Sequence, residues 1–270
     1  MGERKEKIVH KLLLDTKANI AFPSAQLTIY QPSIKEIAML GEHNFLVAVN
    51  SLTKNYKKEV SQDKIGSESL TNFDILMSIV KEKTENSRFI FQNIFQLLEL
   101  ILPNYKLGIS PGSILCQDRD VIEGQPPQMH MIDSKNFDDF AQIIYEMFAL
   151  DAFSGQTGQD YNPGGDRARA LVEKFRKKRE LLAKLRHDRG EDTETSSIFG
   201  RYLTVLAVGE QKDKNELSNY SVYQLIEEFK RFQLKETFDY TVHAKMAGAT
   251  KIKDAKDWMQ DIDFSKDLEE

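Results

Sequence analysis

The residue types that could carry out chemistry are sparse in this chain, and their spacing favours no catalytic or metal site. No two of the five histidines stand four residues apart, the spacing that would place two imidazoles on one helix face to hold a metal ion. Cys116 is the single cysteine, so neither a Cys-x-x-Cys motif nor an intrachain disulfide can form. It lies in a predicted strand, where we expect a buried structural thiol and not a nucleophile. We therefore expect no metal site.

A glycine-rich run at residues 153–160 is the segment most similar to a phosphate-binding loop. It lacks the Gly-Lys-Ser/Thr sequence with which such loops hold phosphate and magnesium. Carboxylates are abundant, but no pair of them stands out as a general acid and base. The sequence therefore predicts no cofactor, no catalytic residue and a protein that is not an enzyme. An enzyme stays an alternative only if folding gathers carboxylates or histidines in one cleft.

The strongest local charge lies in residues 167–189. Ten Lys or Arg oppose three Asp or Glu there, so this segment carries +7, while the whole chain carries −5 and the remainder −12. Leu and Phe recur at helical spacing, which predicts a basic helix. It is a solvated connector, a surface that steers an acidic partner protein, or a nucleic-acid contact. We assign partner binding here to Arg176, Lys177, Arg179, Lys184 and Arg186.

Nucleic acid is the least favoured of the three readings of this segment. No series of aromatic residues is interleaved with the basic ones to stack on bases. The acidic remainder of the chain would also repel a polyanion.

The elements that position these residues are predicted to be mainly helices, with a small β element in the N-terminal half. Residues 8–14 and 27–30 are apolar and partly β-branched, which predicts two short strands. A helix begins at a capping box formed by Ser33 and Glu36 and ends at Gly41. Residues 91–102 are apolar around most of a helix circumference, which is typical of a helix buried in a bundle.

Further elements follow in the same alternating order. Residues 113–116 and 128–133 predict two strands joined by a loose hairpin, and a helix with an apolar face follows at 137–148. A second capping box, Ser221 with Gln224, begins a helix that runs through Phe232. We expect a separate helix after it that ends at Gly248.

Length and composition favour a water-soluble protein with more than one folded part. Apolar residues make up 40% of the 270 residues, yet no run approaches the roughly 18 apolar residues that a membrane span needs. The charged N-terminus is not typical of a signal peptide, so we expect a cytoplasmic protein with no membrane partner. The predicted organisation is an N-terminal α+β domain at residues 1–150, a linker at 151–166, a C-terminal helical domain at 167–262 that begins with the basic helix, and an acidic tail at 263–270.

Two segments together carry a resemblance to a known group of proteins. One is LTIYQPSIKEI at residues 27–37, followed by Gly41-Glu42, and the other is SVYQLIEEFKRF at 221–232, followed by Ala247-Gly248-Ala249 and Asp257-Trp258-Met259. Both resemble small proteins encoded in the tail-morphogenesis region of tailed bacteriophages with Gram-positive or related hosts. Many of these are regarded as tail assembly chaperones.

The resemblance implies a protein that binds the tape measure protein, or other phage tail proteins, transiently in the host cell cytoplasm. A tape measure protein is a long helix with apolar stripes, which a helical protein with exposed apolar surface can shield. We expect the contact surface to include Phe229, Phe232, Trp258 and Met259, because aromatic anchors dominate interface energies. The alternative is that these side chains form the core of a small domain.

Two other functions stay open. A structural virion component, such as a connector, tail or baseplate subunit, would also lack catalytic motifs, and a nucleic-acid-binding protein would use the basic helix. The sequence leaves open whether the chain forms a homo-oligomer.

Overall fold

The computed structural model describes residues 8–60, 70–82, 84–110, 112–120, 127–154 and 197–250, together with 254, 257–262 and 264. Helices form most of this part of the chain, and its strands all lie before residue 134. The elements are α1 (Lys11–Asp15), β1 (Ile20–Phe22), the 3-10 helix η1 (Pro23–Ala25), β2 (Leu27–Ile29), α2 (Ile34–Leu40), α3 (Glu42–Thr53), α4 (Tyr56–Val60), α5 (Asn72–Lys81), α6 (Glu85–Ile101), β3 (Tyr105–Ser110), β4 (Ser113–Asp118), β5 (Met129–Asp133), α7 (Phe137–Met147), α8 (Asp151–Ser154), α10 (Ile198–Gly209), α11 (Lys214–Leu217) and α12 (Val222–Met246). The predicted mainly helical class with a small β element in the N-terminal half is confirmed.

A short antiparallel hairpin of β1 and β2 lies near the start of the chain. Ile20 pairs with Ile29 and Phe22 with Leu27, and all four side chains are buried. The alternation of buried and less buried residues along each strand turns one face of the hairpin toward the core. The strand predicted at residues 27–30 is therefore confirmed.

The strand predicted at residues 8–14 is wrong, because this segment forms the helix α1. His10 precedes the helix, and its Nδ1 accepts a hydrogen bond from the Leu12 amide at 3.2 Å. Lys11 forms an ion pair at 3.0 Å with Asp15, one turn later, and Leu14 is buried. A short apolar run fits one helical turn as well as a strand, so periodicity alone did not separate the two.

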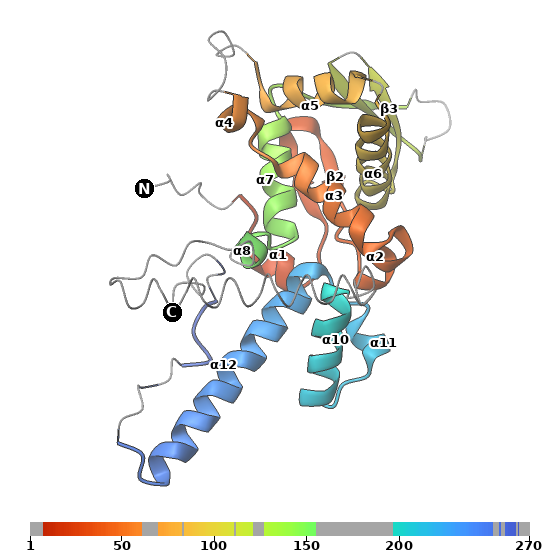
Figure 1. Cartoon of the computed structure of the whole chain (residues 1–270). Coiled ribbons are helices and arrows are strands. Elements are labelled where there is room, and N and C mark those ends of the chain that lie inside the picture. The colour runs from red at the N-terminus through yellow and green to blue at the C-terminus, as the bar shows by residue number, and fades with distance from the viewer. Residues whose placement is uncertain are drawn as a thin grey trace, which may run out of the picture.

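Three helices, α3, α6 and α7, form the centre of the helical body (Figure 1). Phe45 of α3 meets Phe148 edge to face with 4.8 Å between ring centroids. On α6, Leu97, Leu98 and Ile101 are fully buried, which confirms the predicted buried helix, although α6 begins earlier, at Glu85. The capping box of Ser33 and Glu36 is present at the start of α2, and that helix ends before Gly41, which has a φ of 92°.

A second sheet of three antiparallel strands, in the order β3-β4-β5, packs on this body. The two strands predicted at residues 113–116 and 128–133 are confirmed as β4 and β5, with Ile114 opposite Ile132 and Cys116 opposite His130. These four side chains are buried. Burial raises the pKa of the Cys116 thiol to about 12, so this cysteine is the inert structural thiol that its strand context predicts.

The C-terminal helices α10, α11 and α12 lie against one end of the body (Figure 1). The capping box of Ser221 and Gln224 is present at the start of α12. The two helices predicted after it are one continuous helix of 25 residues, which corrects the expected break after Phe232. Residues 233–237 contain neither Gly nor Pro, so nothing in the sequence interrupts the helix there.

The predicted division into two domains and a linker stays a prediction. Most of the linker and the basic helix fall in residues 155–196, outside the described part of the chain. Within the described part, no helix is long and apolar enough to cross a membrane.

Candidate protein-binding surface

The two capping boxes that the sequence analysis singled out lie side by side in space. Ser33 and Ser221 form an isolated antiparallel β-bridge, although they are far apart in the chain. The amide of Ile34 donates to the Tyr220 carbonyl, and the amide of Lys35 donates to the Ser218 carbonyl, both at 2.9 Å. The start of α12 is thereby fixed to the start of α2 by backbone bonds, which satisfy amides that a helix N-terminus leaves unpaired.

Side chains from the N-terminal segment strengthen this attachment of α12. Gln224 Nε2 donates to the Asp15 carbonyl at 2.7 Å, and Lys17 Nζ donates to the Asn219 carbonyl at 2.8 Å. Val222 and Leu225 are fully buried beside them. The first two turns of α12 are therefore part of the body of the molecule and leave little surface for a partner.

The helix α10 is fixed to the body at its N-terminus by a carboxylate. Glu42, the first residue of α3, accepts a hydrogen bond from the Ile198 amide at 2.7 Å and a longer one of 3.4 Å from the Phe199 amide. Phe199 is buried and lies 5.9 Å from Phe45 between ring centroids. The negative charge of Glu42 is also attracted by the partial positive charge at the N-terminus of α10.

Two of the predicted partner-binding aromatics, Phe229 and Phe232, lie in the packing between α12 and α10. The Phe229 ring stacks on Tyr202 with 4.4 Å between centroids. Phe232 packs against Gly209, and a Cβ at that glycine would lie only 2.3 Å from Phe232 Cζ. Both rings are half-buried and join the core, so most of their surface is already used within this chain.

The other two predicted residues, Trp258 and Met259, lie in the segment that returns along α12. Arg231 holds this segment, because its Nη1 donates to the carbonyls of Trp258 and Gln260 at 2.6 and 2.7 Å. Trp258 is half-buried, whereas Met259 is 70% exposed. Arg231 precedes Phe232 in α12, so the backbone of Trp258 lies near the turn of the helix that carries Phe232.

Apolar side chains that the sequence analysis did not select remain uncovered on the same helices. Figure 1 shows that α12 extends beyond the body for much of its length, with α10 beside only its first part. The uncovered side chains, which we call the C-terminal apolar set, are Val205 and Val208 on α10 with Tyr240, Val242 and Met246 on α12. Val242 and Met246 are one turn apart and so share one face of α12.

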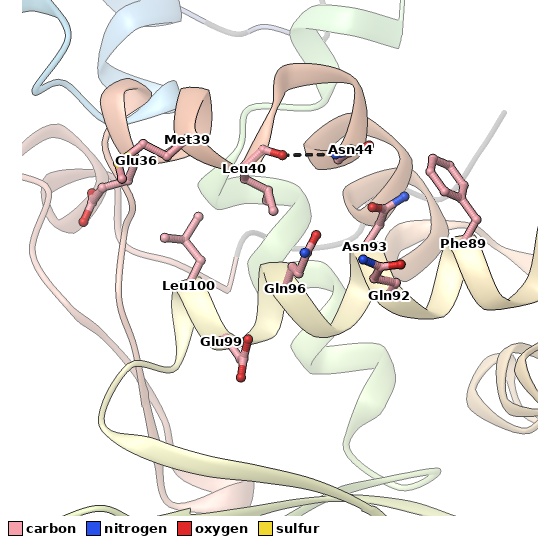
Figure 2. Close-up of a pocket in the computed structure, with 10 residues that line it drawn as sticks. All are labelled: Glu36, Met39, Leu40, Asn44, Phe89, Gln92, Asn93, Gln96, Glu99 and Leu100. Atoms are coloured by element: carbon pink, nitrogen blue, oxygen red, sulfur yellow. Dashed lines mark hydrogen bonds between the residues drawn. The ribbon is translucent and has the colours of Figure 1, made fainter.

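A separate hollow lies between α6 and the helices α2 and α3 (Figure 2). Its volume is about 530 Å³, within the range of small-ligand and side-chain pockets. Carboxamides from both walls lie along its middle, with apolar side chains toward its two ends, and Asn44 Nδ2 donates to the Leu40 carbonyl at 3.1 Å. We call this hollow the α6 groove.

One polar atom in the α6 groove has no partner within the described residues. Asn93 is only 2% exposed, and its Nδ2 is buried without a hydrogen bond. A buried donor without an acceptor costs about 1–3 kcal/mol of stability. In Figure 2 the Asn93 carboxamide lies between α6 and α3, in line with Gln92 and Gln96.

The remaining predicted site residues lie outside the described part of the chain. They are Arg176, Lys177, Arg179, Lys184 and Arg186. Among the residues that are described, no group of three or more His, Cys, Asp or Glu side chains is arranged to hold a metal ion.

Comparison with known proteins bears on this C-terminal region. Residues 198–263 match the family model of the YomV second domain. We call residues 198–263 the phage-type segment after this match. The family is of Bacillus phage type, so the match suggests a phage protein, and it identifies no specific role in assembly. No curated protein and no solved structure gives a significant match.

The matched segment begins with α10, includes α11 and α12, and ends at residue 263. It therefore contains the C-terminal apolar set as well as Phe229, Phe232, Trp258 and Met259. The α6 groove lies outside it. The sequence predicts residues 91–102 as a helix apolar around most of its circumference, and the signal of a groove there was the polar cluster of Gln92, Asn93 and Gln96.

Proposed function

We propose that the protein is a tail assembly chaperone of a tailed bacteriophage. In this role it binds the tape measure protein, or another tail component, transiently while the tail is built in the host cytoplasm, and it carries out no catalysis. The similarity of residues 198–263 to a phage-type domain supports the phage setting. The resemblance of residues 27–37 and 221–232 to proteins of the tail-morphogenesis region supports the assembly role.

The observation that carries the proposal is that the phage-type segment leaves large apolar side chains uncovered. Val208, Tyr240 and Met246 are 76%, 72% and 81% exposed. Single exposed apolar residues are common on protein surfaces, but these lie on two neighbouring helices, one of which extends beyond the body (Figure 1). A partner helix with an apolar stripe can cover the face of α12 that carries Val242 and Met246 and dissociate again.

Co-expression with the tape measure protein of the same phage tests the proposal. We expect the full chain to raise the soluble fraction of the tape measure protein. A triple variant, Val208→Lys, Tyr240→Lys and Met246→Lys, should lose this effect while its far-ultraviolet circular dichroism and melting temperature stay close to those of the parent. These positions are exposed, where substitutions usually change stability by no more than about 0.5 kcal/mol each.

A control variant places two lysines on a different exposed apolar surface. Met129 and Met131 on β5 are 55% and 52% exposed, so Met129→Lys with Met131→Lys should leave the solubilising effect intact. Loss of the effect in both variants, or in neither, would contradict the assignment to the C-terminal apolar set. A tape measure protein that is equally soluble with and without the parent chain would contradict the chaperone role itself.

A further inference from the structure

The α6 groove has a chemical character that the proposed function does not use. Among the residues that the structure describes, its ionisable lining residues are Glu36 and Glu99, with no Lys or Arg beside them. Glu36 is already engaged, because it accepts hydrogen bonds from Ser33 and Tyr30. Glu99 is exposed at the edge of the groove and has no hydrogen bond or ion pair within the described residues.

The carboxamides of α6 add hydrogen-bonding capacity beside this charge. Gln92, Gln96 and Glu99 follow one another at intervals of four and three residues and so share one helix face. Asn93, next to Gln92, holds a buried Nδ2 that has no acceptor among the described residues. A ligand that supplies N–H donors would pair with the side-chain oxygens of Gln92 and Gln96, which are less buried than Asn93.

Apolar side chains complete the walls. Leu40 of α2 and Leu100 of α6 point toward one another at one end, and Phe89 stands at the other end (Figure 2). Met39 is 84% exposed beside Leu40, and Phe89 is 42% exposed. A long aliphatic stem can lie along such side chains while its polar end reaches the amides and the carboxylate.

We propose that the α6 groove binds a peptide segment of a partner protein that inserts an arginine side chain. The aliphatic stem lies between Leu40 and Leu100, and the guanidinium donates to Glu99 and to the side-chain oxygen of Gln96. The guanidinium is planar and carries five donors, so it matches a carboxylate beside carboxamides better than an ammonium does.

Charge decides between this occupant and an anionic one. The two carboxylates among the described lining residues repel phosphate and nucleotides and attract a cationic group. Glu36 lies at the α2 wall, where the positive charge of Lys17 partly offsets its negative charge. Glu99 lies on the opposite wall. The cationic preference therefore rests chiefly on Glu99.

This site is independent of the tail assembly role. It lies on α2, α3 and α6, outside the phage-type segment and apart from the C-terminal apolar set. Failure of one proposal therefore leaves the other standing.

Titration of the full-length ¹⁵N-labelled protein with a short peptide tests the inference. The probe is acetyl-Ala-Leu-Arg-Leu-Ala-amide, and its comparison peptide carries citrulline, a neutral group of the same shape, in place of arginine. We expect the arginine peptide to shift the side-chain amide resonances of Gln92, Asn93 and Gln96 in a saturable way. The citrulline peptide should bind about tenfold more weakly or worse, because it lacks the charge that Glu99 attracts.

Surface variants make the result specific to the groove. Glu99→Gln should weaken the arginine peptide about fivefold or more and leave the citrulline peptide unchanged. Glu236→Gln makes the same change of charge at an exposed position of α12 and should alter neither affinity. Equal binding of the two peptides, resonance shifts outside the groove, or full affinity in Glu99→Gln would each overturn the inference.

Discussion

Glu36 shows how a single side chain can fix both a helix start and a contact between distant segments. Its carboxylate accepts from the Ser33 amide at 2.7 Å and the Ser33 hydroxyl at 2.6 Å, and the Tyr30 hydroxyl donates to it as well. Burial alone would raise its pKa, but these hydrogen bonds and the charge of Lys17 outweigh burial and lower the pKa below the ordinary value of 4.5. Ser33, the residue that it orients, also forms the bridge to Ser221.

The stability of the protein should therefore depend on the ionisation of Glu36. Because the folded state lowers this pKa, the stabilisation is fully present above the ordinary glutamate value and is lost as pH falls through the lower folded-state value. Glu36→Gln keeps a capping side chain, as Gln224 does in the second box, but removes the charge. We expect the variant to lose less stability than the parent between neutral and acidic pH, measured by urea unfolding. An identical pH profile in both proteins would contradict this role.

At the scale of elements, the contact between α10 and α12 depends on the absence of a side chain at Gly209. A Cβ there would collide with the Phe232 ring. Gly209→Ala should destabilise the protein by about 1–2 kcal/mol, since overpacking costs about 1–3 kcal/mol and the better helix propensity of Ala returns up to about 1 kcal/mol.

A double-mutant cycle tests this contact directly. In a Phe232→Ala background the collision is absent, so Gly209→Ala should become neutral or stabilising. The free energies of unfolding of the four proteins, measured in urea, give the coupling between the two positions. Additive effects would show that the two residues do not meet as described.

Elements whose signals are local could be predicted from the sequence. Both capping boxes are formed within four residues, and the buried face of α6 follows from helical periodicity, so neither depends on the rest of the fold. The strand predicted at residues 8–14 is wrong because one helical turn and a short strand share the same apolar pattern. The expected break within α12 is wrong, because residues 233–237 contain no Gly or Pro that would end the helix.

The candidate sites depend on tertiary contacts that no local pattern contains. Phe229 and Phe232 are three residues apart and share one helix face, which suits an aromatic contact surface. In the folded chain, Tyr202 and Gly209 of α10 cover them. The α6 groove needs walls from α2, α3 and α6, which meet only in the folded chain. Sequence could therefore indicate which residues have interface chemistry, but not which of them remain available to a partner.

At the scale of the whole molecule, the phage-type segment is attached to the N-terminal part near the start of its helices. Glu42 fixes α10, and Ser33, Asp15 and Lys17 fix the region around the start of α12. The later part of α12 extends beyond these attachments (Figure 1). This arrangement gives the proposed chaperone a firm base and an exposed helical arm with which to hold a tail protein reversibly.

The central claim is that the protein assists tail assembly and then leaves, and quantitative mass spectrometry tests it most directly. Purified mature virions of the phage that encodes the chain are compared with a lysate of cells in which tails are being assembled. We predict that the protein is abundant in the lysate and absent from the virions. Presence in the virions at a fixed ratio to the tail subunits would contradict the account and would identify a structural component of the particle.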